Sequence, residues 1–369
     1  MKRLLVFMMI AALALTALAG CKSTVPEEEG AAADTVVEND TPTPEVEQDA
    51  PEKVDPGAEP EVKDEELSEK EPADGEDQTP EATPDTPPEE TPAPDNGEEE
   101  KEDDEPSANY DEKNKLSLLD YNVRCADDGV GKMVNERAPR LQKLANQLNP
   151  DLMGFQEVTP KWRGLLEGYF SKDYDYVYKE RNPGGECTPI FWKKDKFQKM
   201  DEGYFWLSET PDQESKGWNA SYYRICSWVR LKIKSTGKEF LYFNSHWDGG
   251  DVVHIGSAQL TLSRARKEGA FSKYAMFLTA DFNMLPWGKG YQVLVENGEL
   301  SDVNYDLENI QDGTVNGYNE DGTSGGRIID MCFYSPGKAV PVSYRILNEK
   351  IDGGYISDHR GLFIEVAVL

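Results

Sequence analysis

The segment from residue 22 to residue 112 is the feature that most limits how this chain can fold. It consists mostly of Glu, Asp, Pro, Thr, Ala and Gly, with almost no aromatic residues. Such a segment buries too little apolar surface to offset the entropy that ordering would cost. Residues 1–112 hold 7 Lys and Arg against 35 Asp and Glu, whereas residues 113–369 hold 32 against 35. Folding is therefore confined to residues 113–369, a nearly neutral chain long enough for one large domain.

We interpret residues 21–112 as a disordered acidic linker. Its like charges repel one another and extend the chain, and its prolines stiffen it. A stalk that holds the folded domain away from a surface fits this composition. The alternative is an acidic tail that binds a basic partner.

The first residues have the features of an export signal. Lys2 and Arg3 precede an apolar stretch, Leu4 to Ala19, that is too short for a comfortable membrane span. The sequence "LAGC" that follows looks like a bacterial lipobox, which predicts a lipoprotein signal peptide over residues 1–20 and a lipidated Cys21. The lipid would anchor the protein to a membrane of the bacterial cell envelope, on its periplasmic or extracellular face. An ordinary secretory signal followed by a chance Cys is the alternative.

Four further cysteines, Cys125, Cys187, Cys226 and Cys332, are widely spaced and lie mostly within or beside apolar runs. We expect buried thiols, although an exported domain can also form disulfides, and the sequence leaves that choice open. No CxxC motif or Cys/His metal spacing occurs, so a zinc site is not favoured.

Short apolar runs in the neutral part of the chain indicate β-strands. These runs span residues 115–123, 151–158, 188–194, 225–233, 239–246, 274–283, 327–335 and 360–369. Helices are expected over residues 135–148, 257–271 and 290–300, the first of which has three leucines at helical spacing. Strands with interspersed helices predict a layered α/β or α+β domain.

Many of these apolar runs end in polar groups that can carry out chemistry. The groups are Asn122, Glu157, His246, Asp281, Asn283, Asp330, Asp358 and His359. Strand ends are rigid platforms on which catalytic groups often lie. Singly, each of these residues also has an ordinary explanation as a solvated strand end or a turn residue.

Some of these positions constrain the interpretation further. Asp330 lies inside the run "IIDMCF", where a buried carboxylate is costly unless it has a partner, and a histidine would provide one. His246 and His359 both adjoin predicted strands, whereas His254 has no such context and is expected to be an ordinary residue. Arg224 is either a surface residue or a contact for phosphate, which its planar guanidinium suits.

Together, these groups favour a hard cation and phosphate chemistry. Carboxylates and amides without soft ligands suit Mg²⁺, with Mn²⁺ or Ca²⁺ as alternatives. A bound metal would neutralise phosphate charge, a carboxylate would orient water, and an imidazole would stabilise the transition state. The set therefore predicts attack by water on a phosphate ester.

Six ordered motifs resemble those of the endonuclease/exonuclease/phosphatase superfamily, also called deoxyribonuclease-I-like. They are "YNVR", "GFQEV", "NSHWD", "ADFN", "RIID" and "SDHRGL", and the resemblance covers residues 115–369. It implies a four-layer α/β/β/α sandwich of two mixed sheets, with the site at one end. The segments "GECTPIFWKKDKF", "FWLSETPD" and "RICSWVRL" are similar to one bacterial branch of the superfamily.

The resemblance also implies roles for individual residues. Glu157 would be the main metal ligand, with Asn122 beside it as a further ligand of the metal or the substrate. Asp281 and Asn283 would position the water or the phosphate. Asp330 would orient His359. Which imidazole protonates the leaving group is not assigned.

Other roles that the resemblance implies lie at the margin of the site. Asp358 would assist the metal or the imidazole of His359. His246 would contact phosphate and would be held by Glu186. Arg224 would also contact phosphate.

The sequence departs from the family pattern mainly in loops that face the substrate. Ala280 replaces the usual Gly before Asp281, a change of little expected consequence. Gly249 and His254 stand in a shortened loop after "SHWD", and Asn316 stands where the branch often has His. Substrate choice is therefore the property that the resemblance defines least.

We compare three possible functions of the folded domain. A surface-tethered phosphoesterase acting on a phosphomonoester or phosphodiester is favoured, and we expect it to be monomeric. A nuclease is the alternative, although a near-neutral domain with only a local cluster of lysines lacks the strongly basic face that duplex binding uses. A non-catalytic surface-binding module is the third, but such a module would be expected to have lost the site residues.

Overall fold

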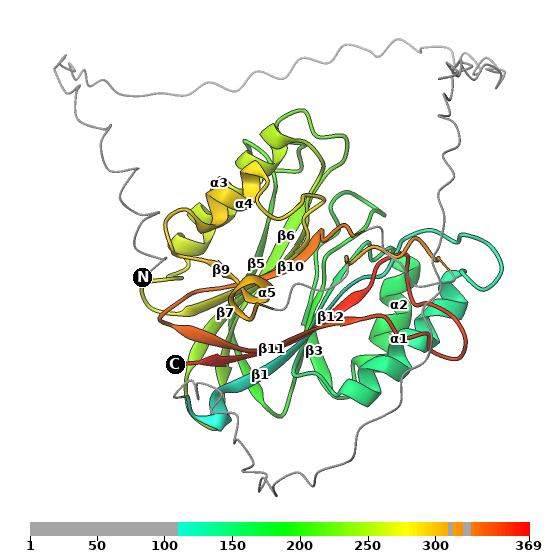
Figure 1. The fold of residues 1–369 in the computed structure, drawn as a ribbon, viewed down its shortest axis with the longest axis horizontal. Coiled ribbons are helices and arrows are strands. Elements are labelled where there is room, and N and C mark those ends of the chain that lie inside the picture. Colours follow the sequence, from blue (N-terminus) through cyan, green and yellow to red (C-terminus); the bar gives the residue numbers. More distant parts are fainter. Residues whose placement is uncertain (1–109, 309–312, 320–325) are drawn as a thin grey trace, which may run out of the picture. The chain divides into compact units, whose positions relative to one another are not determined.

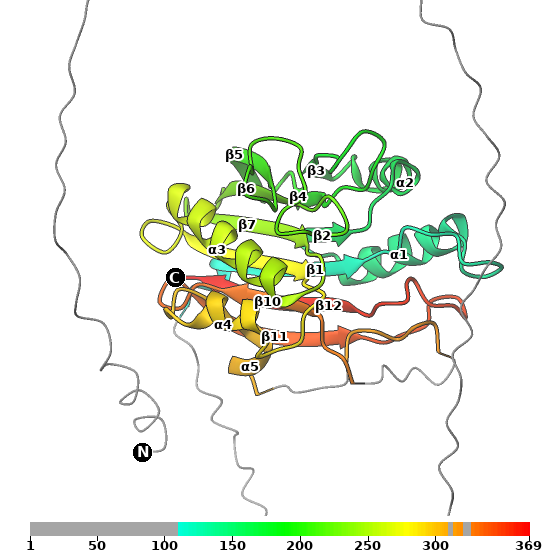
Figure 2. The ribbon, with the colours of Figure 1, turned by 90° about the horizontal axis from the view of Figure 1, so that it is seen from above.

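A computed structural model of the chain describes residues 110–308, 313–319 and 326–369. Within them, two six-stranded sheets pack face to face, and helices cover the outer face of each sheet (Figure 1, Figure 2). This is the four-layer α/β/β/α sandwich that the sequence resemblance implied. The predicted signal peptide, Cys21 and nearly all of the predicted linker lie outside the described residues.

The first sheet has the strand order β11-β12-β1-β2-β4-β3. Its strands are β1 (Lys115–Asn122), β2 (Leu152–Gln156), β3 (Tyr174–Val177), β4 (Ile190–Lys193), β11 (Ala339–Leu347) and β12 (Gly361–Val368). β1 and β2 are parallel, so their carboxyl ends meet at the same edge of the sheet.

The second sheet has the strand order β5-β6-β7-β8-β10-β9. Its strands are β5 (Phe197–Trp206), β6 (Ile225–Ile233), β7 (Glu239–His246), β8 (Ala275–Asp281), β9 (Ser301–Asp302) and β10 (Asp330–Tyr334). β7 and β8 are parallel, whereas β10 is antiparallel to β8. The end of β8 therefore lies beside the end of β7 and the start of β10.

The helices divide between the two outer layers. Helices α1 (Val134–Leu148) and α2 (Pro160–Phe170) pack on the first sheet, and α3 (Asp251–Lys267) and α4 (Lys289–Val295) pack on the second. A 3-10 helix (Glu112–Asn114) precedes β1, and the short α5 (Val303–Asp306) follows β9. Three apolar cores result, one between the sheets and one under each pair of helices.

The two-residue alternation of side chains decides which way the polar strand ends point. Along β1, Leu116 and Leu118 belong to the core between the sheets, and Leu119 and Tyr121 belong to the core under α1 and α2. Since side chains alternate across a strand, Asn122 continues the face of Leu116 and Leu118. It is fully buried at the end of the inter-sheet layer.

The same alternation operates in the second sheet. Along β7, Phe240 and Tyr242 face the first sheet, and His246 continues that face at the end of the strand. Along β8, Phe277 faces the same layer, and Asp281 continues it. The layer between the sheets is thus apolar along most of its length and becomes polar at one end.

A buried arginine of α1 fixes the loop that follows β1. The side chain of Arg137 is fully buried and donates hydrogen bonds to the backbone carbonyls of Val123, Arg124, Ala126 and Ile356. One charged group thereby satisfies the carbonyls of two loops that border the polar end. The guanidinium is suited to this because its five donors have a rigid, planar arrangement.

The predicted strands are confirmed for all eight apolar runs, which form β1, β2, β4, β6, β7, β8, β10 and β12. The four strands that the sequence did not predict, β3, β5, β9 and β11, are the four sheet edges. Their side chains are partly exposed, and β11 contains Pro341 at an irregularity in the strand pairing. A proline is tolerated at an edge because no second neighbour needs its missing N–H group.

The predicted helices are also confirmed, with changes at their ends. Helix α3 begins at Asp251 rather than near residue 257, and α2 was not predicted. The four described cysteines are free thiols, of which Cys125 is half-buried and the others are buried. In the described part of the chain, no helix is long and apolar enough to cross a membrane.

One prediction follows from a buried carboxylate away from the polar end. Burial raises the pKa of Asp302 to about 6, whereas an unfolded Asp titrates near 3.9. The folded protein therefore keeps a proton that the unfolded chain loses as pH rises from about 4 to about 6, and this lowers the stability of the wild type over that range. Asp302→Asn keeps the cap on the Asn304 N–H and removes the titration.

Asp302→Asn should therefore gain stability relative to wild type as pH rises, by about 1 to 3 kcal/mol between pH 4.5 and pH 7.5. Urea unfolding at the two pH values measures this difference. The matched control is Asp175→Asn on edge strand β3, where the carboxylate is exposed. An equal stability difference for Asp302→Asn at both pH values would contradict the prediction.

Candidate active site

The polar end of the sandwich brings together side chains from five strands and the loops that follow them. Strand pairing places His246 opposite Asp281, and Asp281 opposite Asp330. Asn122 ends β1, and Glu157 directly follows β2. Asn122 and Asp281, which are 159 positions apart, therefore meet because the sheets that carry them face one another.

Asn122 links the carboxylates of the two sheets. Its Nδ2 donates to Oε1 of Glu157 at 3.0 Å and to Oδ2 of Asp281 at 2.9 Å, and its Oδ1 accepts the N–H of Arg124 at 2.9 Å. These partners, two acceptors and one donor, fix the orientation of the amide. The amide oxygen thus accepts from the backbone, and the amide nitrogen positions Glu157 and Asp281. Metal or substrate binding by Asn122 stays a prediction.

Glu157 is held in a rare backbone conformation. Its φ of 59° lies in the left-handed region, which costs a non-glycine residue free energy. Burial raises the pKa of its carboxyl, but hydrogen bonds from Cys125 and Asn122 outweigh burial and keep the pKa below its ordinary value. Glu157 is therefore a carboxylate at neutral pH, aimed at the interior of the site.

Asp330 and His359 form a buried ion pair. Nδ1 of His359 lies 2.9 Å and 3.2 Å from the two oxygens of Asp330, and Nε2 lies 3.8 Å from Oδ2 of Asp281. Burial lowers the pKa of His359, but the charges of Asp330 and Asp281 outweigh it and raise the pKa to about 10. The histidine partner that the sequence required for Asp330 is thus His359, and the imidazole is charged.

Some neighbours of Asp281 raise the pKa of its carboxyl and others lower it. Burial and the nearby Asp330 raise its pKa to about 7, while His359 and the hydrogen bonds from Asn122 and Asn283 act against this. Its Oδ1 accepts the backbone N–H of Asn283 at 2.9 Å. The Asp281 carboxyl therefore lies between His246 and His359, and the hydrogen bonds from Asn122 and Asn283 fix its position.

His246 differs from His359 in its charge. Burial and the neighbouring Arg224 lower its pKa well below the ordinary value, so the ring is neutral. Its Nε2 lies 3.1 Å from Nδ2 of Asn283, whose amide also donates to the carbonyl of Trp247 at 3.0 Å. Its buried Nδ1 has no hydrogen-bond partner within the described residues.

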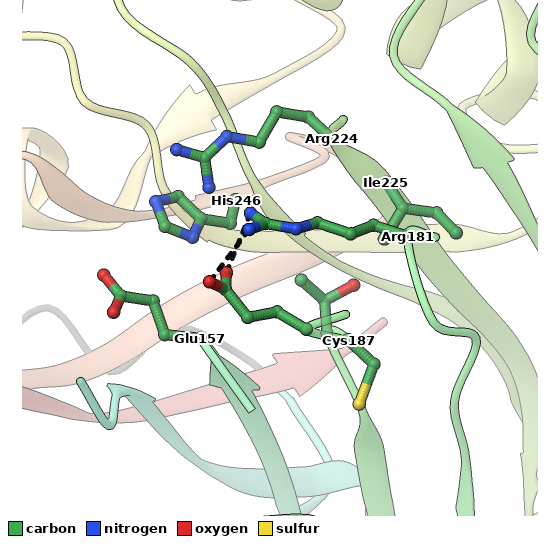
Figure 3. Close-up of a pocket in the computed structure, with 8 residues that line it drawn as sticks. Glu157, Arg181, Cys187, Arg224, Ile225 and His246 are labelled. Carbon is green, nitrogen blue, oxygen red and sulfur yellow. Dashed lines mark hydrogen bonds and ion pairs between the residues drawn. The ribbon is translucent and has the colours of Figure 1, made fainter. Parts of the chain in front are cut away.

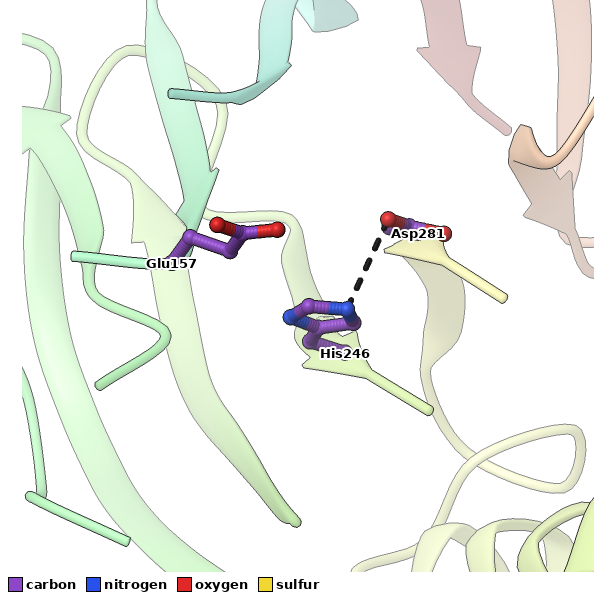
Figure 4. Close-up of side chains that lie close together, drawn as sticks. All are labelled: Glu157, His246 and Asp281. Carbon is purple, nitrogen blue, oxygen red and sulfur yellow. Dashed lines mark ion pairs between the residues drawn. The ribbon is translucent and has the colours of Figure 1, made fainter. Parts of the chain in front are cut away.

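Among the His, Cys, Asp and Glu side chains of the described residues, two groups have donor atoms close enough to hold a cation. The first is Glu157, His246 and Asp281, and the second is Asp281, Asp330 and His359; in each group the donor atoms lie within 4.8 Å of one another. Figure 4 shows the first group with its carboxylates and imidazole directed toward one space. Because His359 is already paired with Asp330, the first group is the better fit for a metal with oxygen ligands.

Glu186 does not hold His246, contrary to the expectation from the resemblance. Its carboxylate instead makes a bidentate ion pair with Arg181, with both N–O distances at 2.9 Å. Figure 3 shows this pair beside His246, Glu157 and Arg224 in one pocket. Arg181 was missed in the sequence because it lies in a loop with no apolar run or family motif to mark it.

Asp358 lies beside the site but belongs to neither cation-binding group. Its Oδ2 is 3.7 Å from Nε of Arg124, and Ser357 donates to its Oδ1 at 3.1 Å. Its charge helps to raise the pKa of His359. Assistance to the imidazole is therefore consistent with its position, while metal binding by Asp358 remains a prediction.

Asn316 has a structural role. It lies at the position where the bacterial branch of the superfamily often has His. Its amide donates to the carbonyls of Ser357 at 3.2 Å and His359 at 3.0 Å. Asn316 thus holds the backbone that carries His359.

A buried network of hydrogen bonds lies next to the site, between the two sheets. Nε2 of Gln156 donates to Asp120 at 2.8 Å and to Asn244 at 2.7 Å, and Asn244 donates to the carbonyls of Phe155 and Pro189. Asn244 and Gln156 come from different sheets, so this network ties the two sheets together next to the site. The sequence pattern could not show that these residues bond to each other.

A four-layer sandwich with carboxylate, amide and imidazole groups at one end of two facing sheets defines a class of enzymes that hydrolyse phosphate esters. The profile of the Endonuclease/Exonuclease/phosphatase family matches residues 121–359, and the chain belongs to this family.

Solved structures of bacterial proteins resemble this chain closely. An endonuclease/exonuclease/phosphatase family protein of Bacteroides thetaiotaomicron is 31% identical with a TM-score of 0.62, over 69% of this chain and 98% of that one. A mannosyl-6-phosphatase of the same organism is 32% identical with a TM-score of 0.62, over 68% of this chain and 99% of that one.

More distant proteins share less with the chain. TDP2 of D. rerio, solved with a single-stranded DNA product, is 18% identical with a TM-score of 0.56, over 69% of this chain and 99% of that one, and shares the fold alone. An uncharacterized protein of Acanthamoeba polyphaga mimivirus is 32% identical over 144 residues, 37% of this chain. The chain spans about half the length of that curated relative, 53%.

The charge of His359 can be tested directly. Asp330→Asn removes the nearest negative charge, so the pKa of His359 should fall by about 1 to 3 units. The chain has only 3 histidines, so the ring signals can be followed by NMR over a pH titration. The signal of His254, whose pKa depends on burial, Asp251 and Asp248 and not on Asp330 or His359, is the internal control. An unchanged titration of His359 would contradict the ion pair.

Proposed function

We propose that this protein is a metal-dependent phosphoesterase that hydrolyses a small phosphorylated substrate by attack of water. The observation that carries the proposal is the meeting of Glu157, Asp281 and His359, with their amide and imidazole neighbours, at one end of the sandwich. Family membership supports hydrolysis of a phosphate ester. Because all of these site groups are present, a non-catalytic binding module is not favoured.

The residues present fit a hard divalent cation. Glu157 and Asp281 offer carboxylate oxygens, and the neutral His246 lies with them in one group. The predominance of oxygen donors favours Mg²⁺, with Mn²⁺ or Ca²⁺ as alternatives. When bound, such a cation neutralises phosphate charge and acts as a Lewis acid.

The remaining steps belong to the chain's own side chains. Asp281 and Asn283, at the end of β8, position the attacking water and the phosphate. The charged His359, held by Asp330, directs its Nε2–H into the site, where it stabilises negative charge that develops on a phosphate oxygen. Asn122 keeps Glu157 and Asp281 at a fixed separation.

Charge and similarity both favour a small substrate. Residues 113–369 hold 32 Lys and Arg against 35 Asp and Glu, so the domain lacks the excess of positive charge that nucleic-acid binding uses. A neighbour with 32% identity is a mannosyl-6-phosphatase. These observations support a phosphorylated sugar or a compound of similar size rather than nucleic acid.

The proposal predicts metal-dependent phosphate release that requires His359. With Mg²⁺, Mn²⁺ or Ca²⁺, the protein should hydrolyse small phosphate esters, and chelation should abolish the activity. His359→Ala should lower the rate by about 10²- to 10⁴-fold, since it removes a positioned imidazole. Asp302→Asn, which changes a buried carboxylate away from the polar end, is the control and should keep the wild-type rate.

The assay compares phosphate release from generic monoesters and diesters with nicking of plasmid and single-stranded DNA. Faster turnover of DNA than of every small ester would favour the nuclease alternative. No activity of the wild type on any of these substrates with any of the three metals would overturn the phosphoesterase proposal and leave the binding module.

We also propose that the enzyme is anchored to the bacterial cell envelope by lipid on Cys21, with residues 22–112 as the tether. Cys21→Ser should release the protein from the membrane fraction while kcat on a soluble substrate stays unchanged, because the substitution lies outside the folded domain. Fractionation followed by the activity assay measures both effects. Retention of Cys21→Ser in the membrane fraction would contradict the lipid anchor.

A further inference from the structure

A second pocket lies between three loops that also border the candidate active site. One loop follows β1, one contains Tyr318 and one precedes β12, and Arg140 of α1 completes the lining. The pocket encloses about 470 Å³, part of it open to solvent, which is within the roughly 300–1,000 Å³ of pockets that hold small ligands. It is therefore large enough to take a charged group of a small molecule.

The lining of this pocket is cationic and aromatic. It includes the side chains of Lys132, Arg140 and Lys350 and the rings of Tyr318 and Tyr355, and the other lining residues are three glycines and one valine. No acidic side chain is among the lining residues that the structure describes. A small pocket with several cations and no acid suits an anion.

Aromatic rings position both lysines at the pocket. Nζ of Lys132 lies 4.9 Å from the centre of the Tyr318 ring, and Nζ of Lys350 lies 4.9 Å from the centre of the Tyr355 ring. A ring attracts an ammonium group through its quadrupole and does not cancel the charge of that group. Both ammonium groups are therefore held at the pocket by neutral rings.

Acids on the neighbouring segments are paired with cations outside the pocket. Asp128 forms an ion pair with Arg124, and Asp352 forms one with Lys143. Lys132 forms no ion pair with a carboxylate of the described residues, and its side chain makes only the contact with the aromatic ring there. Its ammonium group can therefore bind an anionic ligand without first breaking a salt bridge.

A glycine allows Arg140 to lie in the wall of the pocket. Nη1 of Arg140 donates to the carbonyls of Gly131 at 2.8 Å and Tyr355 at 3.0 Å, which joins the loop after β1 to the loop before β12. A Cβ at position 354 would clash with Cζ and both Nη atoms of Arg140, so Gly354 makes room for the guanidinium. Nε and Nη2 make no hydrogen bond to the described residues, so they are available to a ligand.

One wall of the pocket is fixed to the segment that carries His359. The backbone N–H groups of Asn316 and Gly317 donate to the carbonyl of Asp358, and Oδ1 of Asn316 accepts the N–H of Tyr318 at 2.7 Å. The Asn316 amide also donates to the carbonyl of His359. The pocket therefore lies beside the candidate active site, on the side of α1.

On the basis of the phosphoesterase function proposed above, we propose that this pocket binds a second anionic group of the substrate. The enzyme then prefers a compound that carries another phosphate, or a carboxylate, besides the phosphate ester that is hydrolysed. The ammonium group of Lys132 and the guanidinium of Arg140 bind the oxygens of the second group. That group is not itself hydrolysed, because none of the residues in the two candidate cation-binding groups lines this pocket.

The test uses compounds in which two anionic groups are separated by spacers of increasing length. Alkanediol bisphosphates and carboxyalkyl phosphates are compared with alkyl monophosphates as inhibitors of p-nitrophenyl phosphate hydrolysis by the wild type. At the matching length, the compound with two anionic groups should inhibit competitively and about 10- to 100-fold more tightly than the monophosphate, the effect of added hydrogen bonds to charged groups. Equal inhibition by both kinds of compound at every length would overturn the inference.

Lys132→Gln removes one cation of the pocket, and Lys143→Gln is the matched control. Lys143 is paired with Asp352 and does not line the pocket, so both variants remove one positive charge from the same region. Lys132→Gln should lower the preference for two anionic groups over one about 10-fold, whereas Lys143→Gln should keep the wild-type preference. Circular dichroism and thermal unfolding show whether each variant is folded. An undiminished preference in folded Lys132→Gln would contradict the role of the pocket.

Titration calorimetry with each bisphosphate gives a readout that needs no turnover. The dissociation constant of the preferred bisphosphate should rise about 10-fold in Lys132→Gln and stay at the wild-type value in Lys143→Gln. Inhibition that does not compete with p-nitrophenyl phosphate would assign the pocket to a free anion and overturn its role in substrate binding. If the wild type hydrolyses no phosphate ester, the proposed function fails, and the calorimetry still decides whether the pocket binds an anion.

Discussion

The packing of two sheets against each other, combined with the two-residue alternation of strands, is the constraint on which the rest of the structure depends. Leu118, Phe240 and Phe277 lie in the layer between the sheets, and each strand continues the same face to its end. At that end the apolar side chains are replaced by Asn122, His246 and Asp281, which are forced toward one another. The core and the site are thus two parts of one layer.

Burial at this end separates the roles of groups with the same chemistry. His359 gains charge from Asp330 and Asp281, whereas His246 loses it through burial beside Arg224. One imidazole can therefore donate to a phosphate oxygen, while the other is neutral and lies with the candidate metal ligands. The difference arises from neighbours that adjacent strands provide, not from the histidines themselves.

Much of the fold and of the site could be predicted because interior strands leave a strong sequence signal. The runs that contain Phe155, Phe243 and Leu278 are buried on both faces, between the other sheet and the helices, so they are continuous and apolar. The edge strands lack this signal and could not be predicted. β5 and β11 expose part of their side chains, so their sequences resemble ordinary polar segments. The motifs at the strand ends then identified the family and most of the site.

The sequence by itself determined where the interior strands lie within residues 113–369 and which polar groups end those strands. Only the tertiary structure decided which groups bond: Glu186 to Arg181 rather than His246, and the Asn122 amide nitrogen, not its oxygen, toward the carboxylates. Local patterns report burial and spacing along the chain. They contain no information about contacts between loops brought together by the packing of two sheets.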